Sequence, residues 1–242
     1  MDILILGGGY GTRLFGKYNK DTYFPKGLVK INGKPCIEYA LETFSDNLIG
    51  NIILETNKEG KLFYEEWLNK SNFKEKIEIY TEEISTPENC LGVLETINLV
   101  FNKYRFIKPV LIISPDNIFT MKQDELITNY TSGVKIATYY LKLLEDGKKY
   151  GVLELKSNNV ISCIEKPSSP KSKIIRTSCE IWGPEAFSLL STWNKTNNSD
   201  KVGDFINFLV KKEISVESHK TKGLWIDIGN KFDLEIAKVT LG

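Results

Sequence analysis

The chain has 242 residues, with 32 basic and 31 acidic side chains, so its formal net charge is +1. This balance provides no long-range field for nucleic acid or an anionic membrane, and we expect neither as a partner. The four cysteines form no C-x-x-C pair, which argues against a zinc site or a disulfide scaffold and fits a reducing compartment. No apolar run approaches the ~20 residues that span a bilayer, and the first residues do not resemble a signal peptide. We therefore expect a cytoplasmic globular protein.

The first 145 residues or so alternate between short apolar runs and segments with helical periodicity. Strands are predicted at 3–6, 51–54, 110–113 and 135–141, and helices at 37–44, 61–68, 93–101 and 123–130. This β-α-β order predicts an α/β fold, a three-layer αβα sandwich with a Rossmann-like, mostly parallel sheet. Ligands of such folds bind at the carboxyl ends of the strands.

The pattern becomes richer in β-structure after about residue 145. Residues 150–155 and 160–164 alternate around Ser157-Asn158-Asn159, which predicts a β-hairpin. Helices are predicted at 184–191, at 204–212 and from about residue 231, with a short segment at 223–228 between the last two. Because the sequence contains no linker and no internal repeat, we expect a single domain over residues 1–242, with halves of about 1–145 and 146–242.

A glycine-rich segment follows the first predicted strand directly, since residues 7–13 have the sequence G-G-G-Y-G-T-R. Glycines let the backbone turn its N–H groups toward one point, where a phosphate can approach closely. The Rossmann pattern G-x-G-x-x-G is not met, because Thr12 stands at the third glycine and no acidic residue follows about twenty positions later. A P-loop pattern runs from Gly11 to Lys17, but Tyr18 replaces the hydroxyl that binds magnesium. A plain turn that needs several glycines is the simple alternative.

Five segments, in order along the chain, resemble the motifs of the sugar-nucleotidyltransferase family, whose best-known members are thymidylyltransferases that act on glucose 1-phosphate. They are G-G-Y-G-T-R-L at 8–14 followed by P-K at 25–26, P-D-N-I-F at 115–119, Y-G-V at 150–152, E-K-P at 165–167 and W-I-D-I-G at 225–229. Each motif alone is weak, but five in the family's order form a strong resemblance. The resemblance covers nearly the whole chain and is to the short form of the thymidylyltransferases.

The resemblance implies that a sugar 1-phosphate attacks the α-phosphorus of a nucleoside triphosphate and that pyrophosphate leaves. Because the attacking phosphate is largely ionised at neutral pH, no general base is required, and catalysis depends on alignment and charge neutralisation. The implied catalytic residues are Arg13, on the departing pyrophosphate, Lys26, at the α-phosphate, and Asp116. The implied nucleotide-binding residues are Leu6, Gly8, Gly9, Gly11, Thr12, Arg13, Lys26 and Gly92.

The resemblance also implies Mg²⁺, bound by Asp116 and Asp227 together with phosphate oxygens. If the two aspartates share one ion, their carboxylates lie within ~10 Å of each other. The implied residues for the acceptor are Asn117, Gly151, Glu165, Lys166 and Arg176, with Lys166 on the sugar phosphate and the Glu165 carboxylate accepting hydrogen bonds from sugar hydroxyls. The ordinary alternatives are a solvated surface group for either lysine and a turn residue for Asp116.

Three departures from the family pattern leave the substrates open. The separation of Arg13 and Lys26 is a few residues longer than usual, which suggests a larger loop over the phosphates. The stretch that reads the base is not recognisable at 86–92, apart from Gly92. The usual A-V-T-G of the sugar pocket is replaced by I-R-T-S at 175–178. Arg176, one of only three arginines in the chain, either points to solvent from an alternating strand or enters the acceptor pocket and pairs with an anionic group.

The sequence as a whole favours an enzyme that makes a nucleotide sugar from a nucleoside triphosphate and a sugar 1-phosphate. One alternative is a cytidylyltransferase of the phosphocholine type, whose N-terminal half looks similar, although the Y-G-V and E-K-P motifs favour a sugar. Another is a non-catalytic regulatory homologue, against which the retained Arg13, Lys26, Asp116 and Asp227 argue. The base, the sugar and the oligomeric state are not predicted.

Overall fold

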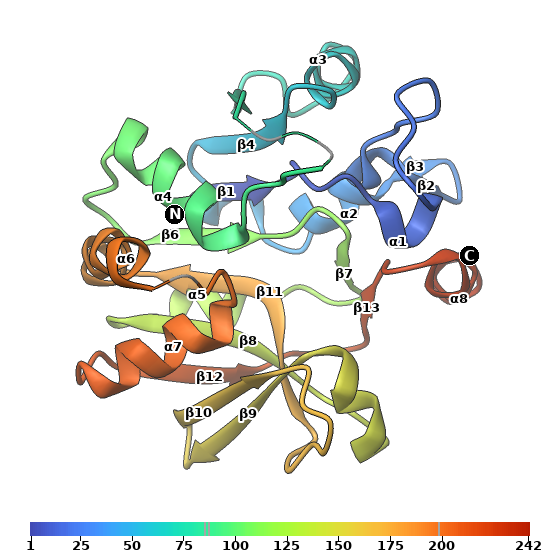
Figure 1. Cartoon of the computed structure of the whole chain (residues 1–242). Helices are drawn as coiled ribbons and strands as arrows, with labels where there is room; N and C mark the ends of the chain where they lie inside the picture. Colours follow the sequence, from blue (N-terminus) through green and yellow to red (C-terminus); the bar gives the residue numbers. More distant parts are fainter. Residues whose placement is uncertain (85, 87, 198) are drawn as a thin grey trace. The chain divides into compact units, whose positions relative to one another are not determined.

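The computed structural model describes residues 1–84, 86, 88–197 and 199–242, and the chain forms two compact units (Figure 1). The first unit comprises Met1–Leu91, Ile112–Asp124 and Lys222–Gly242, and the second comprises Gly92–Leu111 and Glu125–Thr221. The units are therefore interleaved in the sequence, whereas the change of pattern suggested one division near residue 145. Within the 86–92 stretch, residue 87 lies outside the described residues.

The first unit contains parallel strands in the order β5-β4-β1-β6. The strands are β1 (Asp2–Leu6), β4 (Ile52–Asn57), β5 (Ile77–Glu82) and β6 (Val110–Ile113), and the helices are α1 (Thr12–Phe15), α2 (Cys36–Leu41), α3 (Lys61–Leu68) and α8 (Lys231–Thr240). All six residues of β4 are buried, as expected for a parallel strand that is covered on both faces. The chain re-enters this unit within β6.

Two short antiparallel ladders complete the first unit. One pairs β2 (Lys30–Ile31) with β3 (Lys34–Pro35), and the other pairs β7 (Asn117–Phe119) with β13 (Trp225–Asp227). The β7–β13 ladder joins segments that lie far apart in the sequence. Helix α8 follows β13 and begins with a capping box, in which the Asn230 side chain accepts from two backbone N–H groups and Asp233 reaches back.

The second unit is a mixed sheet in the order β11-β8-β12-β10-β9, in which β11 also pairs with β9. Its strands are β8 (Val134–Tyr140), β9 (Gly151–Lys156), β10 (Asn159–Glu165), β11 (Ile174–Trp182) and β12 (Val216–Lys220). Strands β8 and β12 are parallel, and the other pairs of this unit are antiparallel. The β9–β10 pair is the hairpin expected from the sequence. The predicted α/β fold class is confirmed, with the antiparallel pairing gathered in this unit.

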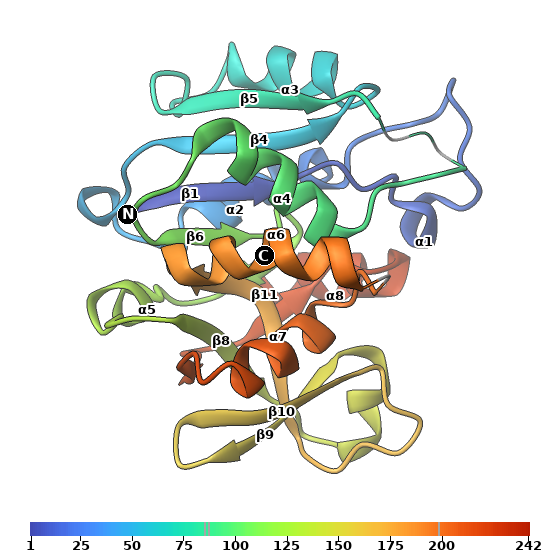
Figure 2. The same ribbon diagram turned by 60° about the vertical axis from the view of Figure 1, so that its left-hand side comes forward.

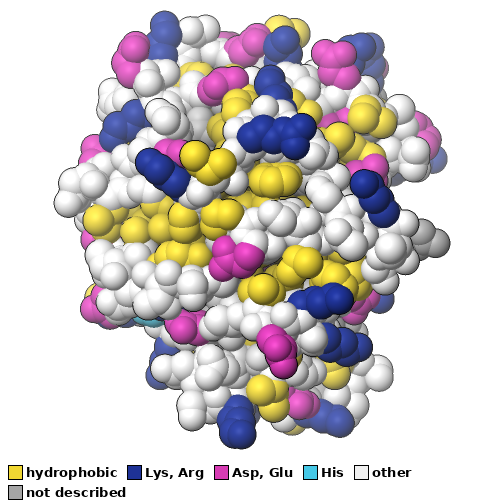
Figure 3. Space-filling view, turned by 90° about the vertical axis from the view of Figure 1, so that its left-hand side faces the viewer, with side chains coloured by type: hydrophobic (Ala, Val, Ile, Leu, Met, Phe, Trp, Pro, Cys, Tyr) yellow, Lys and Arg dark blue, Asp and Glu magenta, His cyan; other side chains and the backbone are white. Residues whose placement is uncertain are grey.

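Helices α4 (Val93–Tyr104), α6 (Pro184–Thr196) and α7 (Val202–Lys211) belong to the second unit, and α5 (Asp124–Thr128) begins where the chain enters it. Helix α6 packs against α4 and against α7, and α7 lies on β10 (Figure 2). No helix of the described residues is long and apolar enough to cross a membrane. On the face shown in Figure 3, basic and acidic side chains are interspersed, in keeping with the near-zero net charge.

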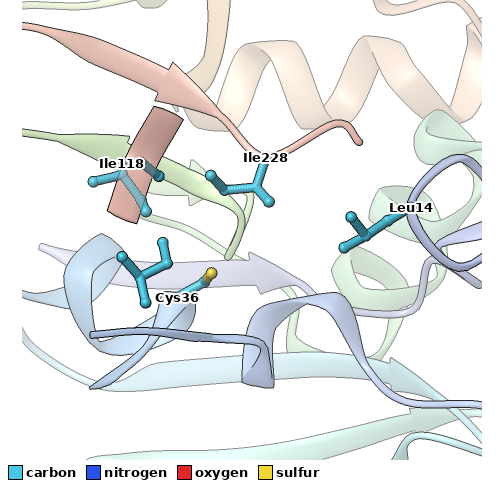
Figure 4. Packing of buried hydrophobic residues seen from close by; sticks show 6 residues of the cluster. Leu14, Cys36, Ile118 and Ile228 are labelled. Carbon is cyan, nitrogen blue, oxygen red and sulfur yellow. The ribbon is translucent and has the colours of Figure 1, made fainter. Parts of the chain in front are cut away.

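In the first unit, the segments that carry predicted site residues pack against one another through a hydrophobic cluster (Figure 4). Its buried members are Leu14, Ile31, Cys36, Ile118, Ile228 and Ala237. Leu14 follows Arg13, Ile118 follows Asn117, and Ile228 follows Asp227, so each polar residue has an aliphatic neighbour in this core. Burying one such side chain stabilises a fold by roughly 1.5–3 kcal/mol. The cluster therefore holds the three segments in a fixed position relative to one another.

Candidate active site

The glycine-rich segment connects β1 to the short helix α1. Gly11 adopts a left-handed conformation with φ of 65°, which glycine reaches without steric cost. Its carbonyl accepts hydrogen bonds from the N–H groups of Leu14 and Phe15, at 2.9 and 3.0 Å, and so starts the helix. The adjoining Gly9, Thr12 and Arg13 are exposed and accessible to a ligand.

Two side chains from the end of β4 hold the backbone of Gly8. The Gly8 N–H donates to Glu55 Oε2 at 3.2 Å, and Asn57 Nδ2 donates to the Gly8 carbonyl at 2.6 Å. A Cβ at position 8 would lie 2.5 Å from Glu55 Oε1 and 3.2 Å from the Asn57 backbone nitrogen, so a side chain there would displace the Glu55 carboxylate. Burial raises the pKa of Glu55 to about 8, despite the hydrogen bond from Gly8. Sequence analysis assigned Gly8 to the nucleotide and missed Glu55 and Asn57, which fix it.

Aromatic packing orders the long loop between Arg13 and Lys26. The ring of Tyr10 contacts those of Tyr18 and Tyr23, with centroids 5.3 and 5.8 Å apart. Tyr23 in turn contacts Phe63 of α3, at 6.1 Å. Tyr18 and Tyr23 of this loop thus pack on the glycine-rich segment, and Tyr23 also packs on α3.

Lys26 and Asp116 form an ion pair between Nζ and Oδ2. Lys26 opens a short 3-10 helix, Lys26–Leu28, and Asp116 follows β6, where it is 8% exposed. The other carboxylate oxygen, Oδ1, accepts hydrogen bonds from Ser114 Oγ at 2.7 Å and from Asn117 Nδ2 at 3.0 Å. Burial raises the pKa of Asp116, but the Lys26 charge and the hydrogen bonds outweigh burial and lower it below the ordinary value. Asp116 is therefore an ionised, buried carboxylate.

Asn117 connects the two predicted metal ligands. The β7–β13 ladder places Asp227 opposite Asn117, whose Nδ2 lies 3.0 Å from Asp116 Oδ1 and 3.5 Å from Asp227 Oδ1. The separation of these oxygens cannot exceed the sum of the two distances, so it is below the ~10 Å that a shared ion allows. The Trp225 indole N–H donates to Asn117 Oδ1 at 2.8 Å and fixes the orientation of the amide. Asn117, which the sequence assigns to the acceptor, thus contacts both aspartates.

The charges of this group are not balanced. Burial, followed by the charge of Asp116, raises the pKa of Asp227 to about 6, and the positive charges of Lys26 and Arg13 act in the opposite direction. A cation would relieve the repulsion between the two carboxylates, which are the hard oxygen ligands that Mg²⁺ prefers. Among the described residues, no group of three or more His, Cys, Asp or Glu side chains is arranged to hold a metal. Mg²⁺ commonly binds one or two carboxylates and completes its coordination with phosphate or water oxygens, and the two aspartates fit such an ion.

The second unit brings together three of the residues that the sequence assigned to the acceptor. Arg176 Nη1 lies 3.4 Å from Glu165 Oε1, and the Arg176 side chain is 15% exposed. A Cβ at Gly151 would lie 2.7 Å from Arg176 Cδ, so the arginine stem passes directly over this glycine. The expectation that an alternating strand sends Arg176 to solvent is not met, because its guanidinium is paired with Glu165 and Glu180 within the protein.

Lys166 has an unusual backbone for a residue that precedes proline. Its φ is 47°, in the left-handed region that costs a non-glycine residue about 1 kcal/mol or more. The Lys166 N–H donates to the Tyr150 carbonyl at 2.9 Å, which holds this conformation, and the side chain is exposed. Gly92 also belongs to the second unit, where it caps α4, and a Cβ there would lie 2.2 Å from the Asp200 Cβ.

Comparison with known proteins identifies relatives along the whole chain. The profile of the nucleotidyl transferase family matches residues 3–241. A protein of Sulfolobus acidocaldarius named as a candidate mannose-1-phosphate guanyltransferase is 26% identical over 93% of this chain and 59% of its own length. The bifunctional protein GlmU of Methanococcus aeolicus is 27% identical over 97% of this chain and 53% of its own length. The chain thus spans a little over half the length of these relatives.

Solved structures share the fold. A candidate glucose-1-phosphate thymidylyltransferase from Bacillus anthracis, in complex with sucrose, has a TM-score of 0.81 at 22% identity and covers 99% of this chain and 95% of its own. A UDP-glucose pyrophosphorylase complexed with UDP-glucose has a TM-score of 0.79 at 22% identity, with 99% and 97% covered. At such identity the likeness concerns the fold alone. The family profile spans nearly every residue, and on that ground the chain belongs to the nucleotidyl transferase family.

Proposed function

We propose that this chain is a sugar-1-phosphate nucleotidyltransferase, which joins a nucleoside monophosphate from a nucleoside triphosphate to a sugar 1-phosphate. The observation that carries the proposal is the group formed by Lys26, Asp116, Asn117 and Asp227. In it, the Asn117 amide contacts both carboxylates, Lys26 pairs with Asp116, and the charges of Lys26 and Arg13 act on Asp227. Family membership supports the reaction class, and the name of the Sulfolobus relative supports a sugar phosphate as acceptor.

In the proposed reaction, an oxygen of the sugar phosphate forms a bond to the α-phosphorus, and the bond from that phosphorus to the bridging oxygen of pyrophosphate breaks. The exposed Arg13 and the amides next to it would bind the triphosphate. An arginine suits this role because its planar fork reaches two phosphate oxygens at once. Lys26 would provide positive charge at the α-phosphate, where negative charge builds up in the transition state.

Asp116 and Asp227 would hold Mg²⁺, which when bound supplies positive charge against the triphosphate oxygens. The hydrogen bonds from Ser114 and Asn117 orient the Asp116 carboxylate before any ligand arrives. In the second unit, Glu165 would accept hydrogen bonds from hydroxyl groups of the sugar, and Lys166 would bind its phosphate. The strained backbone at Lys166 supports this assignment, because such strain concentrates at functional positions.

A pyrophosphate-release screen tests the proposal. Five nucleoside triphosphates are each combined with a panel of sugar 1-phosphates and with phosphocholine, in the presence of Mg²⁺. We expect release with at least one sugar 1-phosphate and release about 100-fold slower or less from the Asp116→Asn variant. Asp46→Asn, at an exposed aspartate of the same unit, should retain activity. Release with phosphocholine alone would indicate a cytidylyltransferase of that type. No release with any pair would indicate a non-catalytic homologue.

A further inference from the structure

Arg176 in β11 is paired within the protein with two carboxylates. Its Nε donates to Glu180 Oε1 at 2.7 Å, and its Nη2 lies 2.5 Å from the same oxygen. Its Nη1 lies 3.4 Å from Glu165 Oε1. Burial lowers the pKa of Arg176, but Glu180 and Glu165 outweigh burial and raise it, so the guanidinium remains charged. The arginine therefore uses all three of its nitrogens on protein partners.

Glu180 is the more deeply buried of the two acidic partners of Arg176. It is 3% exposed, and its second oxygen accepts a hydrogen bond from the Trp182 indole N–H at 2.9 Å. Trp182 itself is packed against the rings of Phe187 and Phe205, with centroids 5.8 and 5.2 Å apart. A carboxylate this deep is costly unless it is paired and hydrogen-bonded, and here Arg176 and Trp182 do both.

Glu165 is the second acidic partner of Arg176, and it is the last residue of β10. Its Oε1 accepts the Gly203 N–H at 3.1 Å in addition to the contact with Arg176. Two glycines make room for the arrangement. A Cβ at Gly151 would lie 3.0 Å from Glu165 Oε1, and one at Gly203 would lie 2.9 Å from Glu165 Cγ. Glu165 is thus oriented by Arg176 and by the backbone, while its side chain keeps an exposed fraction of 15%.

The three side chains carry one positive and two negative charges, so the group has a formal charge of −1. A phosphate or carboxylate of an acceptor would meet this net negative charge, with the guanidinium already paired. Hydroxyl or ammonium groups, which donate hydrogen bonds, would be attracted instead. The alternative expected from the sequence is that Arg176 pairs with an anion of the acceptor. Such an anion would have to lie beside the Glu165 and Glu180 carboxylates, whose repulsion disfavours it.

We propose that Arg176, anchored by Glu180, is a positioning residue that orients the Glu165 carboxylate, and that the negative group so formed selects an acceptor with hydroxyl or amino groups at this place and disfavours one with a carboxylate. This inference rests on the proposed function, because it concerns the sugar 1-phosphate of that reaction. It assigns Arg176 no direct contact with the acceptor.

The first test compares Arg176→Met, Arg176→Lys and Glu180→Gln with the wild type in the pyrophosphate-release assay. We expect Arg176→Met to raise KM for the sugar 1-phosphate at least about tenfold while KM for the triphosphate changes less than about twofold. Arg176→Lys should recover part of the loss, since lysine keeps the charge but reaches fewer partners. Arg105→Met, at an exposed arginine of the same unit, is the matched control. Equal losses for both substrates would mean a merely structural role and would overturn the inference.

The second test compares a neutral hexose 1-phosphate with the corresponding hexuronic acid 1-phosphate. The wild type should use the neutral sugar at least about tenfold more efficiently, and Glu180→Gln, which removes one negative charge, should narrow this ratio. A wild type that prefers the uronic acid and loses that preference in Arg176→Met would show direct contact with the carboxylate and overturn the inference. A wild type without activity on any acceptor would refute the proposed function itself, whereas an active wild type with unchanged acceptor KM in Arg176→Met would refute only the positioning role.

Discussion

Each unit of the molecule has a cation that acts on two carboxylates, but the two groups differ in how completely the charges are satisfied. In the first unit Lys26 pairs with Asp116, and the pKa of Asp227 is raised to about 6. In the second unit the guanidinium of Arg176 reaches both of its acidic partners. A lysine is a point charge on a flexible stem, whereas an arginine is a rigid fork.

The comparison separates a group that is complete within the protein from one that a ligand would complete. Adding a divalent cation to the first group would neutralise the pair of aspartates that Lys26 alone does not satisfy. Adding a cation to the second would displace an arginine that is already bonded. The same charge count therefore supports a metal site in one unit and a positioning device in the other.

The largest expected effect is on turnover, from removing one charge of the first group. Asp116→Asn and Asp227→Asn should each lower kcat by about 100-fold or more, or ~2.7 kcal/mol, because a cation held there stabilises charge that develops in the transition state. Pyrophosphate release at saturating substrates measures this, with Asp46→Asn as the control at an exposed position. If either variant keeps nearly full turnover at every magnesium concentration, the two aspartates do not share a catalytic ion.

The same two substitutions should have opposite effects on stability. The pKa of Asp227 is about 6 in the folded protein against an ordinary 3.8, so the unfolded chain binds fewer protons between these values and stability falls as the pH rises through them. Asp227→Asn should therefore stabilise the metal-free protein by up to about 3 kcal/mol at neutral pH and by little below about pH 4. The pKa of Asp116 is lowered, so Asp116→Asn should destabilise at neutral pH.

Urea unfolding at several pH values, in the presence of a chelator, measures both variants against the wild type. Shifts of the same sign for the two substitutions would contradict the unequal sharing of Lys26. Such a result would also remove the contrast between the two units, because the charge of Asp227 would then be compensated as fully as that of Asp116.

A smaller effect is expected at Arg13. Arg13→Lys keeps the charge that lowers the pKa of Asp227 but loses the fork that can span two phosphate oxygens. We expect kcat/KM to fall at least about tenfold, or ~1.4 kcal/mol. Arg105→Lys, the same substitution at an exposed arginine, is the control and should leave kcat/KM unchanged. Near-normal kinetics of Arg13→Lys would show that Arg13 acts only as a point charge.

The smallest effect is expected at Lys166 and should be confined to one substrate. Lys166→Ala should weaken binding of the sugar 1-phosphate by about tenfold and leave binding of the triphosphate within about twofold. Calorimetry with each ligand separately measures this, and Lys156→Ala, at an exposed lysine of the neighbouring strand, is the control. An equal loss for both ligands would contradict the division of binding residues between the units.

Much of the fold is predictable from the sequence where the apolar pattern is strong. Helix α3 and strand β6 begin and end where the sequence predicts. Strand β12 is not predictable in this way, because Val216 is its one apolar residue and the other positions read E-S-H-K. It is a strand because it pairs in parallel with the buried β8, which no local pattern reveals.

The candidate site likewise has residues that the sequence predicts and contacts that it does not. The motifs identified Asp116 and Asp227, but the bridging role of Asn117 depends on a ladder between distant segments. The partnership of Glu180 with Arg176 could have been predicted from the sequence. Glu180 is a lone carboxylate in an apolar stretch, four positions after one of the chain's three arginines. Glu55 likewise follows three aliphatic residues in β4. An acidic residue in such a setting needs a partner, which is a reason to search for one in the sequence.

The interleaved chain has a consequence for the order in which the protein can be built. The glycine-rich segment and Asp116 lie within the first 124 residues, but Asp227 and two members of the hydrophobic cluster, Ile228 and Ala237, arrive only with the last segment. A nascent chain that has already made the whole second unit still lacks β13, and Ile118 and Leu14 still lack these partners. The first unit therefore closes last, through contacts of long sequence separation, which fold slowly and leave apolar surface open in the meantime.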